Sequence, residues 1–308
     1  MHFECELVIR IERLGKFIAP QFAKKYYSHV SLGLDLTARD LQRKCKENGI
    51  VFIGPDPDIM DKLGDKISAK KVAVSCGVPI IESNKKKVSS LKIAKEEADR
   101  IGYPIMLKAA SGGGGRGMRI LYKSEDLDIA FDEARREAKN AFGDDTVFLE
   151  KYVEEPKHIE VQIAADHFGN IIHMMERDCS AQRRYQKVLE ESPATSIPQI
   201  TKEKMYEAAI AIARAINYTN LGTVEFIVDT SGNENDVPFY FLEMNTRLQV
   251  EHPVTEAILG IDLVEMQLEI AAGKKLAPKQ SDIKSKGHAI EARVYAENPK
   301  KNFMPSTG

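Results

Sequence analysis

The chain has 308 residues, of which 43% are hydrophobic and 29% charged, and its formal net charge at pH 7 is -2. This length predicts about two domains or one large α/β unit, and the composition excludes a disordered, collagen-like or coiled-coil chain. Because the charge is nearly balanced, no overall basic field points to nucleic acid or to an acidic membrane surface, and any phosphate must be bound locally.

Cysteine spacing and hydropathy narrow the class further. The four cysteines are scattered without CxxC spacing, which is typical of reduced thiols rather than of a disulfide frame or a zinc site. The longest apolar runs, such as 208–213, are too short to span a bilayer, and no secretory signal opens the chain. We therefore expect a cytoplasmic protein without a membrane partner, whose metal ligands, where it binds metal, are oxygens.

Helix and strand signals alternate along most of the chain and predict an α/β or α+β fold. Residues 1–43 mix basic and apolar residues without a helical or strand period, so no element is predicted there, whereas from Lys44 the sequence predicts the end of a helix and a turn at Gly49. Apolar residues alternate with Glu160 and Gln162, which predicts a strand buried on one face only. The expected elements, in chain order, are a strand at 50–53, a helix at 58–76, a strand at 78–81, a helix at 89–101, strands at 104–107 and 118–122, a helix at 124–140, strands at 147–150, 159–163 and 170–176, a helix at 201–217 with Thr201 as its N-cap, strands at 224–229 and 239–244, a helix at 263–272 and a strand at 288–295.

A glycine-rich loop lies between two of these strands, with five glycines among residues 112–117. Such a backbone exposes N–H groups that can surround an anion, so the loop is a candidate phosphate site. It is not a Walker loop, since no Gly-Lys-Ser/Thr follows and a strand rather than a helix comes next. Lys108, at the end of the preceding strand, can place a charge on the phosphates. The alternatives are a flexible hairpin tip and an ordinary surface lysine.

Two glutamates face each other across the last predicted hairpin. If its turn is centred near Glu234, Glu225 and Glu243 lie opposite each other, because each is nine residues from that centre. Like charges opposed in a ladder are destabilising, so the pair favours a cation between them, and Asn245 adds a third oxygen on the same face. Three oxygens are typical of Mg²⁺ bound with a nucleotide. The alternative is an exposed strand face that carries glutamates.

Two polar stretches follow strands, where α/β proteins often place chemistry. In residues 243–256, Arg247 offers a planar fork for a small oxyanion, Gln249 a neutral donor, and Glu251 a possible general base. The other stretch, residues 176–187, is basic, and its alternative is a solvated turn.

From about Lys44 to Gly308 the chain resembles the biotin carboxylases, the ATP-grasp component of the biotin-dependent carboxylases. The resemblance implies an ATP-grasp fold. Several long motifs that carry it occur in the expected order: GDKISAK at 64–70, LKAASGGGGRGMRI at 107–120, FLEKYVEEPKHIEVQI at 148–163, ERDCSAQRRYQK at 176–187 and FLEMNTRLQVEHPVTE at 241–256.

The resemblance implies roles for individual residues. ATP would be bound by Lys66, Lys108, Gly113, Gly114, Gly115, Glu150, Lys151, Val153, His158, Gln182, Glu225 and Ile227. Bicarbonate would lie against Lys187, Arg247, Gln249 and the backbone of Val250. Two Mg²⁺ or Mn²⁺ would be held by Glu225, Glu243 and Asn245. The catalytic residues would be Lys187, Arg247, which stabilises the biotin enolate, and Glu251, which accepts a proton from bicarbonate.

The implied reaction is the ATP-dependent carboxylation of biotin through carboxyphosphate. The implied partners are a biotin carboxyl carrier protein, which presents biotin as the substrate, and a carboxyltransferase subunit, with a homodimer in the full-length form. No nucleic-acid partner is expected.

The resemblance also divides the chain, and it implies truncation at both ends. Residues 1–43 match no family motif, and we expect an aberrant or truncated start. The expected parts are residues 44–65 as a remnant of the N-terminal domain, 66–273 as the ATP-grasp domain with a lid subdomain at about 84–153, and 274–308 as the start of the C-terminal domain. In the family that last domain supplies a further arginine for bicarbonate and biotin, which we expect this chain to lack.

Two other functions stay open at this point. One is another ATP-grasp carboxylate ligase, such as a carbamoyl-phosphate synthetase-like or purine-biosynthetic enzyme. The other is a fragment that binds nucleotide without catalysis, because an αβ layer removed from a sheet exposes apolar surface. The bicarbonate motifs favour the biotin carboxylase, with activity impaired in this chain.

Overall fold

The computed structural model of the chain forms two compact units, Met1–Phe52 and Ile53–Gly308, which are described separately. The described residues are 3–11, 27–36, 39–64, 66–86, 88–109, 118–142, 145–183, 186–231, 235–298, 300 and 303–305. In the first unit β1 (Phe3–Ile11) pairs antiparallel with β2 (Tyr27–Leu36), and α1 (Arg39–Glu47) follows. The prediction of no element in residues 1–43 is therefore wrong, whereas the helix end expected from Lys44 is confirmed by α1.

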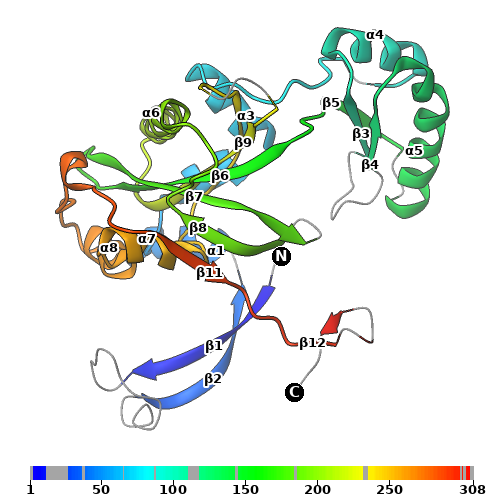
Figure 1. The fold of residues 1–308 in the computed structure, drawn as a ribbon. Coiled ribbons are helices and arrows are strands. Elements are labelled where there is room, and N and C mark those ends of the chain that lie inside the picture. The colour runs from blue at the N-terminus through cyan, green and yellow to red at the C-terminus, as the bar shows by residue number, and fades with distance from the viewer. Residues whose placement is uncertain are drawn as a thin grey trace. The chain divides into compact units, whose positions relative to one another are not determined.

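The second unit contains a six-stranded central sheet and a three-stranded sheet, here called the lid sheet (Figure 1). The central sheet has the order β10-β9-β6-β7-β8-β11 and the lid sheet β4-β3-β5, with every neighbouring pair antiparallel. The elements of this unit are α2 (Pro57–Gly64), α3 (Lys66–Ser75), α4 (Leu91–Ile101), β3 (Ile105–Ala109), β4 (Met118–Leu121), η2 (Ser124–Asp126), α5 (Leu127–Phe142), β5 (Val147–Lys151), β6 (Pro156–Ala165), β7 (Ile171–Arg183), β8 (Gln186–Ser192), α6 (Gln199–Ala215), β9 (Asn220–Asp229), β10 (Phe239–Asn245), α7 (His252–Leu259), α8 (Leu263–Ala271), η3 (Gln280–Asp282), β11 (Ala289–Ala292), β12 (Glu297–Asn298) and β13 (Met304–Pro305).

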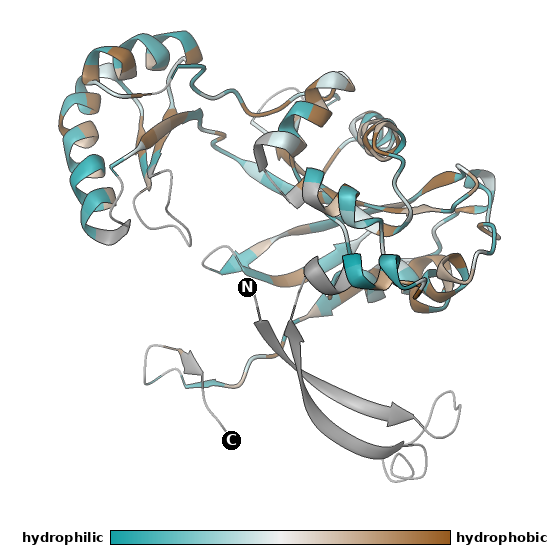
Figure 2. Cartoon of the chain, turned by 180° about the vertical axis from the view of Figure 1, so that it is seen from behind, coloured by the Kyte–Doolittle hydropathy of each residue, from teal (hydrophilic) through white to brown (hydrophobic). Residues whose placement is uncertain are grey.

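The lid sheet is covered by α4 and α5, whose apolar residues recur at helical spacing. In α5, Leu127, Phe131 and Ala134 are buried against the strands. Helix α4 begins where the Ser90 hydroxyl accepts a hydrogen bond from the Ile93 N–H (3.4 Å), and it ends at Gly102, whose φ of 79° a side chain would strain. In Figure 2 the outer faces of these helices are hydrophilic and the lid strands hydrophobic.

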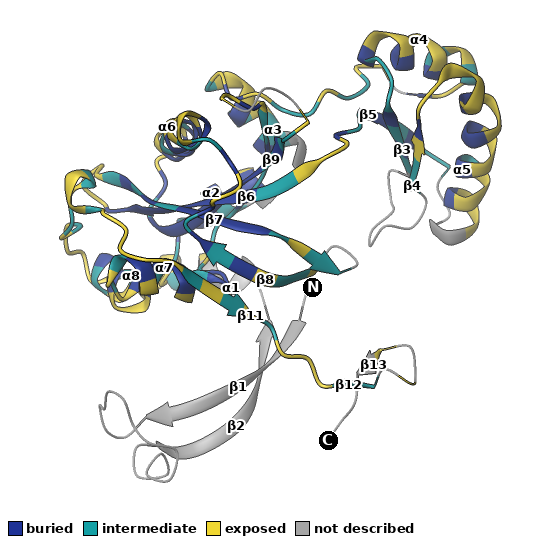
Figure 3. Ribbon diagram, viewed as in Figure 1, coloured by how far each residue is buried: buried dark blue, intermediate teal, exposed yellow. Residues whose placement is uncertain are grey.

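The middle strands of the central sheet, β6, β7 and β9, are largely buried on both faces, whereas β8 and β11 are partly exposed (Figure 3). One face packs against α2, α3 and α6, through residues such as Ile159, Ile212 and Phe226. The other face packs against α8 through Met174 and Leu263, and against α7. Because helices cover both faces, polar side chains on the sheet lie in the interior, where they need partners.

Strand β6 shows the result of this coverage. Its odd-numbered residues, such as Val161, face the larger apolar cluster, as the alternation predicts. Glu160 and Gln162, however, have exposed fractions of 0%. The expectation of a strand with one solvated face is wrong, because α7 and the segment before it cover that face.

Several boundaries differ from the prediction. Residues 50–53 form no strand and are exposed, since no strand of the described residues pairs with them. The predicted helix at 58–76 is two helices, α2 and α3. The predicted strand at 78–81 is reduced to one bridge between Ile80 and Phe241.

Other differences concern residues read as loops or caps. The polar stretch around residue 187 is not a solvated turn alone, because it pairs as the hairpin of β7 and β8. Helix α7 is absent from the prediction, since its sequence is short and begins in a polar run. Thr201 does not cap α6; it is buried, and its hydroxyl accepts a hydrogen bond from the Val237 N–H (3.2 Å).

His173 on β7 makes the fold sensitive to acid. Burial lowers the pKa of its ring to about 4, against 6.5 ordinarily, although Glu176 opposes the shift. Nδ1 also accepts a hydrogen bond from the Met175 N–H (3.4 Å), which protonation at that atom would abolish, and the ring stacks on Tyr206 at 3.9 Å.

The free energy of unfolding should therefore fall as the pH drops from about 6.5 to 4, because the unfolded state then binds more protons than the folded state. His173→Phe, which keeps the stack, should remove this component in urea titrations at several pH values. The exposed control His167→Phe should keep the wild-type dependence. An unchanged pH dependence in His173→Phe would contradict the assignment.

Candidate active site

A row of charged residues crosses the central sheet, with one residue on each of four neighbouring strands. Glu243 on β10 is the Cα partner of Glu225 on β9, Glu225 of Glu160 on β6, and Glu160 of Arg177 on β7. The predicted opposition of Glu225 and Glu243 is confirmed, although a bulge interrupts β10 beside it. Three adjacent carboxylates repel one another, so the row needs cations. We call Glu243, Glu225 and Glu160 the carboxylate row.

Lys187 on β8 supplies one of these cations. Its Nζ lies 2.5 Å from Glu160 Oε2, 3.0 Å from Glu225 Oε1 and 2.5 Å from Glu251 Oε1. Burial alone would lower the pKa of Lys187, but the three carboxylates outweigh burial and raise the pKa well above its ordinary value. The ammonium is therefore permanently charged, and it joins the carboxylate row to the start of α7.

Glu225 is the most heavily coordinated member of the row. Its Oε1 accepts hydrogen bonds from Asn245 Nδ2 (2.9 Å) and Gln249 Nε2 (2.8 Å), and His158 Nε2 lies 3.0 Å from Oε2. Burial opposes ionisation, yet His158 and Lys187 hold the pKa of Glu225 far below its usual range. Glu225 is thus an anion at any physiological pH.

Arg177 supplies a second cation, and it is completely buried. Its Nε donates to Glu160 (2.5 Å), and its other nitrogens donate to neutral oxygens. Those acceptors are Gln162 (2.8 Å), Thr255 (3.0 Å), Thr223 (3.2 Å) and Gln249 (3.3 Å). The guanidinium therefore ties β6, β7, β9 and α7 together beneath the carboxylate row.

Glu251, the residue before α7, lies between two cations. Lys187 contacts its Oε1, and Arg293 Nη2 donates to its Oε2 at 2.9 Å. Arg293 Nε in turn donates to Glu190 (2.6 Å). Burial raises the pKa of Glu251, but Lys187 outweighs burial, so the pKa lies below its ordinary value. The carboxylate is therefore charged, buried and held in one orientation.

A second group of residues connects the lid sheet with α3. Glu150 on β5 accepts a hydrogen bond from Lys70 (3.1 Å) and forms a short ion pair with Lys108 on β3. Lys151 turns away and donates to the carbonyl oxygens of Gly102 and Tyr103, each at 2.9 Å. The Glu150 carboxylate thus pairs with the two lysine ammonium groups, which a phosphate could otherwise bind.

The remaining predicted nucleotide residues lie along β6, β7 and β9. Gln182 Nε2 donates to His158 Nδ1 (3.2 Å), and His158 is the Cα partner of Ile227. Val153 is buried. Lys66 begins α3, but its side chain is not described, and Gly113, Gly114 and Gly115 lie outside the described residues.

Not every predicted residue joins this cluster. Arg247 is exposed, and its Nη1 donates to the Leu248 carbonyl (3.2 Å), while the Val250 side chain is 58% exposed. Glu243 shares the register of the carboxylate row and lies at its end, on the edge strand β10. The roles given to these three residues, like those of the other predicted site residues, stay predictions.

The structure adds residues that sequence reasoning missed, chiefly Glu160, Arg177, Glu190 and Arg293. An arginine was expected only beyond residue 308, yet Arg293 already contacts Glu251. One signal was present for Glu160: a charged residue within an otherwise apolar strand suggests a buried functional group. Arg293 had no local signal, because 42 residues separate it from Glu251.

The donor set fits a hard divalent cation. Glu225 and Glu243 offer carboxylate oxygens, and the Asn245 side chain, turned about its amide, would offer its carbonyl oxygen. His158, Glu160 and Glu225 also offer ligand atoms within 4.8 Å of one another, but the Lys187 ammonium already contacts both carboxylates. The Glu225–Glu243 side of the row is therefore the better metal position.

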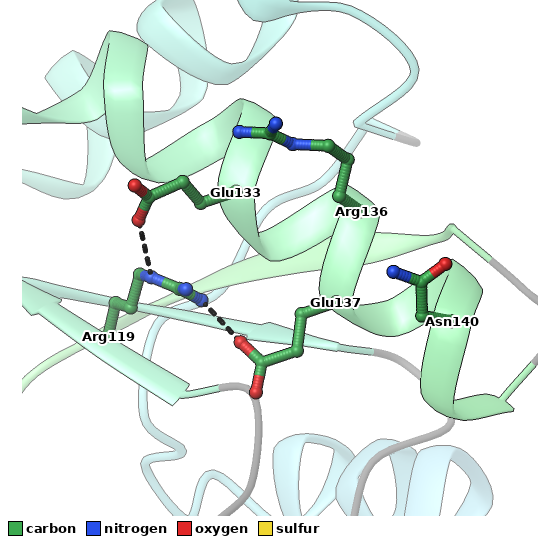
Figure 4. Close-up of a pocket in the computed structure, with 5 residues that line it drawn as sticks. All are labelled: Arg119, Glu133, Arg136, Glu137 and Asn140. Carbon is green, nitrogen blue, oxygen red and sulfur yellow. Dashed lines mark hydrogen bonds and ion pairs between the residues drawn. The ribbon is translucent and has the colours of Figure 1, made fainter.

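A hollow of about 690 Å³ lies apart from this chemistry, on β4 and α5 (Figure 4). Arg119 there is paired with Glu133 (3.5 Å) and Glu137 (3.0 Å), so its charge is already balanced.

None of the described helices is both long enough and apolar enough to cross a membrane.

The chain is similar to a known protein family and to proteins of known name. The family described as the carbamoyl-phosphate synthase L chain, ATP binding domain, matches residues 65–279. The chain is 48% identical over 303 residues to biotin carboxylase 2 of Bacillus subtilis, covering 98% of this chain and 66% of that protein. It is 50% identical over 264 residues to the mitochondrial methylcrotonoyl-CoA carboxylase subunit alpha of Rattus norvegicus, covering 86% of this chain and 36% of that protein.

A solved structure gives the same comparison in three dimensions. The biotin carboxylase domain dimer of 2-oxoglutarate carboxylase from Hydrogenobacter thermophilus, in complex with MgADP, ADP and bicarbonate, superposes with a TM-score of 0.73. The two sequences are 46% identical, over 87% of this chain and 58% of that one. The chain therefore spans between 36% and 66% of the length of these relatives.

Proposed function

The chain belongs to the biotin carboxylases of the ATP-grasp superfamily, and from this membership we propose that it carboxylates biotin on a carrier protein with ATP and bicarbonate. The ATP-grasp fold expected from the motifs is confirmed by the same relatives. One observation carries the proposal for this chain: Glu251 is held between Lys187 and Arg293, beside Gln249 and the carboxylate row.

In the proposed reaction Glu251 removes a proton from bicarbonate. Its pKa is held low, so it is ionised when substrate enters, and Lys187 and Arg293 offer donors to the bicarbonate oxygens as they release the carboxylate. The bicarbonate oxygen then attacks the γ-phosphorus of ATP, and ADP leaves as carboxyphosphate forms. Carboxyphosphate decomposes to CO₂ and phosphate, the phosphate removes the biotin N1 proton, and the biotin anion attacks CO₂.

Arg247 has a separate part in this proposal. It lies beyond β10 with its guanidinium exposed, where it can reach a substrate that enters from solvent. A planar cationic fork stabilises an enolate oxygen, as the biotin step requires. Glu251, in contrast, has an exposed fraction of only 3% and is protected from water.

Divalent metal would be held by Glu225, Glu243 and Asn245. When bound, Mg²⁺ or Mn²⁺ neutralises charge on the phosphates and on the transferring phosphoryl group. The protein groups around it keep Glu225 ionised and oriented, through Gln249, His158 and Lys187.

The nucleotide is proposed to displace Glu150 from Lys108 and Lys70. Both lysines donate to this carboxylate, which occupies them much as a phosphate oxygen would. We propose residues 66–273 as the ATP-grasp domain and about 84–153 as its lid. The supporting observation is that the lid sheet and its two helices fall within the latter range.

Partners and location belong to the same proposal. Biotin carried by a carrier protein fits the exposed position of Arg247, and a carboxyltransferase subunit would accept the product. A homodimer is supported by the relative from Hydrogenobacter thermophilus, which is described as a dimer. A cytoplasmic location is supported by reduced cysteines, of which Cys179 is buried.

The test is ATP cleavage by this chain with and without bicarbonate, followed by carboxylation of free biotin. We expect ADP release that requires both bicarbonate and Mg²⁺ and that biotin stimulates. ADP release that is stimulated by ammonia instead of biotin would favour a carbamoyl-phosphate synthase-like ligase, the class of enzyme for which the matching family is described. ATP binding without any bicarbonate-dependent cleavage would contradict the proposal for this chain.

Glu225→Gln should raise the Mg²⁺ concentration needed for half-maximal ATP binding by at least about ten-fold, because one metal carboxylate is lost. The measurement is nucleotide binding at fixed ATP across a range of Mg²⁺. The exposed control Glu203→Gln on α6 should leave the Mg²⁺ requirement unchanged. An equal requirement in Glu225→Gln and wild type would remove Glu225 from the metal site.

A further inference from the structure

Two glutamates outside the carboxylate row face each other across the edge of the central sheet. Glu190 on β8 and Glu291 on β11 are Cα partners in an antiparallel ladder. Glu190 is completely buried, and Glu291 is partly buried. Among the described residues, neither Glu190 Oε2 nor Glu291 Oε2 has a hydrogen-bond partner, although both atoms are buried. Two buried acceptor oxygens without a donor are costly, and the directly opposed charges add to the cost.

The surrounding charges do not neutralise this pair. Arg293 donates to Glu190 Oε1, but it also serves Glu251. The other charged or titratable groups that act on the two carboxyls are Glu251, Lys187 and His252. Counting the connected side chains, the five acidic ones are Glu160, Glu190, Glu225, Glu251 and Glu291, and the four basic ones are Arg177, Lys187, Arg293 and His158. Acidic groups thus exceed basic ones in a largely buried region.

A proton is the simplest ligand for such a pair. It converts one carboxylate into a donor, supplies the missing partner for the other, and removes one excess charge. Metal is a poorer fit, because the pair supplies only two carboxylates and the Arg293 guanidinium already donates to one of them.

We propose that Glu190 and Glu291 share one proton at neutral pH, and that this pair positions Arg293 against Glu251. The positioning of Arg293 by this pair rests on the proposed function of Glu251. With the proton between the two Oε2 atoms, Glu190 Oε1 remains an acceptor for Arg293 Nε, and Arg293 Nη2 remains directed at Glu251.

Loss of the shared proton at alkaline pH places two like charges opposite each other. Repulsion then displaces Glu190 or Glu291, and Arg293 loses its fixed orientation. Burial raises the pKa of both carboxyls, which is the direction that a shared proton requires. Glu190 and Glu291 are positioning residues in this scheme, because they reach the reacting atoms only through Arg293 and Glu251.

The shared proton is tested by infrared spectroscopy on the folded chain, without any turnover. At pH 7 the wild-type chain should show the carbonyl stretch of a protonated carboxylic acid, and Glu291→Gln and Glu190→Gln should each remove that band. Glu191→Gln is the matched control, because Glu191 is the next residue on β8 and pairs with His288 instead (3.0 Å). Absence of the band in wild type, or its persistence in both variants, would overturn the shared proton.

The positioning role is tested by the pH profile of bicarbonate-dependent ATP cleavage. In Glu291→Gln the new side-chain amide is uncharged and can donate to Glu190 at any pH. This variant should therefore move the alkaline limb of kcat upward by about one pH unit or more, with little change in KM for ATP. An unmoved alkaline limb would overturn the positioning role. Absence of turnover in wild type would count against the proposed function, and the positioning role would fall with it, while the infrared result still decides the shared proton.

Discussion

Glu251→Gln should lower the rate of bicarbonate-dependent ATP cleavage by at least about 100-fold, because a positioned general base typically contributes that much or more. Glutamine keeps the shape of the side chain but cannot accept the bicarbonate proton. The affinity for ATP should stay within about three-fold of wild type, since Lys108 and Glu225 bind the nucleotide and metal in this scheme.

The measurement is the steady-state rate together with equilibrium nucleotide binding, on the same preparation. Glu265→Gln, on the exposed side of α8, is a control for the loss of one carboxylate and should behave as wild type. Equal losses of rate and ATP affinity in Glu251→Gln would refute the role of base. The variant should also lose less stability below pH 4.5 than wild type, because Glu251 has a lowered pKa and its stabilising charge is lost as acid protonates it.

Arg177→Met should lower the free energy of unfolding by at least about 3 kcal/mol, because it breaks a fully buried ion pair and leaves Glu160 with Lys187 as its remaining cation. Methionine has a similar length and no donors, so Glu160, Gln162 and Gln249 each lose a hydrogen bond inside the sheet. Urea denaturation followed by circular dichroism measures the loss, and Arg214→Met, exposed on α6, is the control.

A second variant separates the ion pair from simple packing. Adding Glu160→Gln to Arg177→Met removes the carboxylate that has lost its buried ion pair, so the double variant should be more stable than the sum of the two single losses predicts. A loss below about 1 kcal/mol in Arg177→Met would show that the buried network contributes little to folding. Strictly additive losses would show that Glu160 and Arg177 are not coupled.

The local sequence pattern was sufficient to predict the hairpin of β9 and β10. Equal distances from its turn placed Glu225 opposite Glu243, and the strand register confirms that placement. The lid helices were predicted nearly to their ends for a similar reason, since apolar spacing and Ser90 act within one element. Such features depend on neighbours close in sequence.

The rest of the site depends on groups that are distant in sequence. Glu160 looked like the solvated side of a strand, because the helix and segment that cover it begin some 90 residues later, at Glu251. The prediction of a buried strand at residues 50–53 was wrong in the opposite sense. An apolar run predicts burial, but a strand also needs a neighbouring strand to pair with, and these residues are exposed. Arg293 could not be assigned to Glu251 until β8 and β11 were paired.

The Lys187 ammonium has one further consequence. Because Glu160 and Glu225 already share a counterion, a metal that arrives at Glu225 meets a neutralised group and not a bare charge. If Glu225 holds a divalent metal, as proposed above, the metal would compete with Lys187 for this carboxylate. Lys187 contacts Glu251 as well as Glu225, so the proposed metal site and the proposed base share one ammonium group, and a change at either carboxylate would be felt at the other.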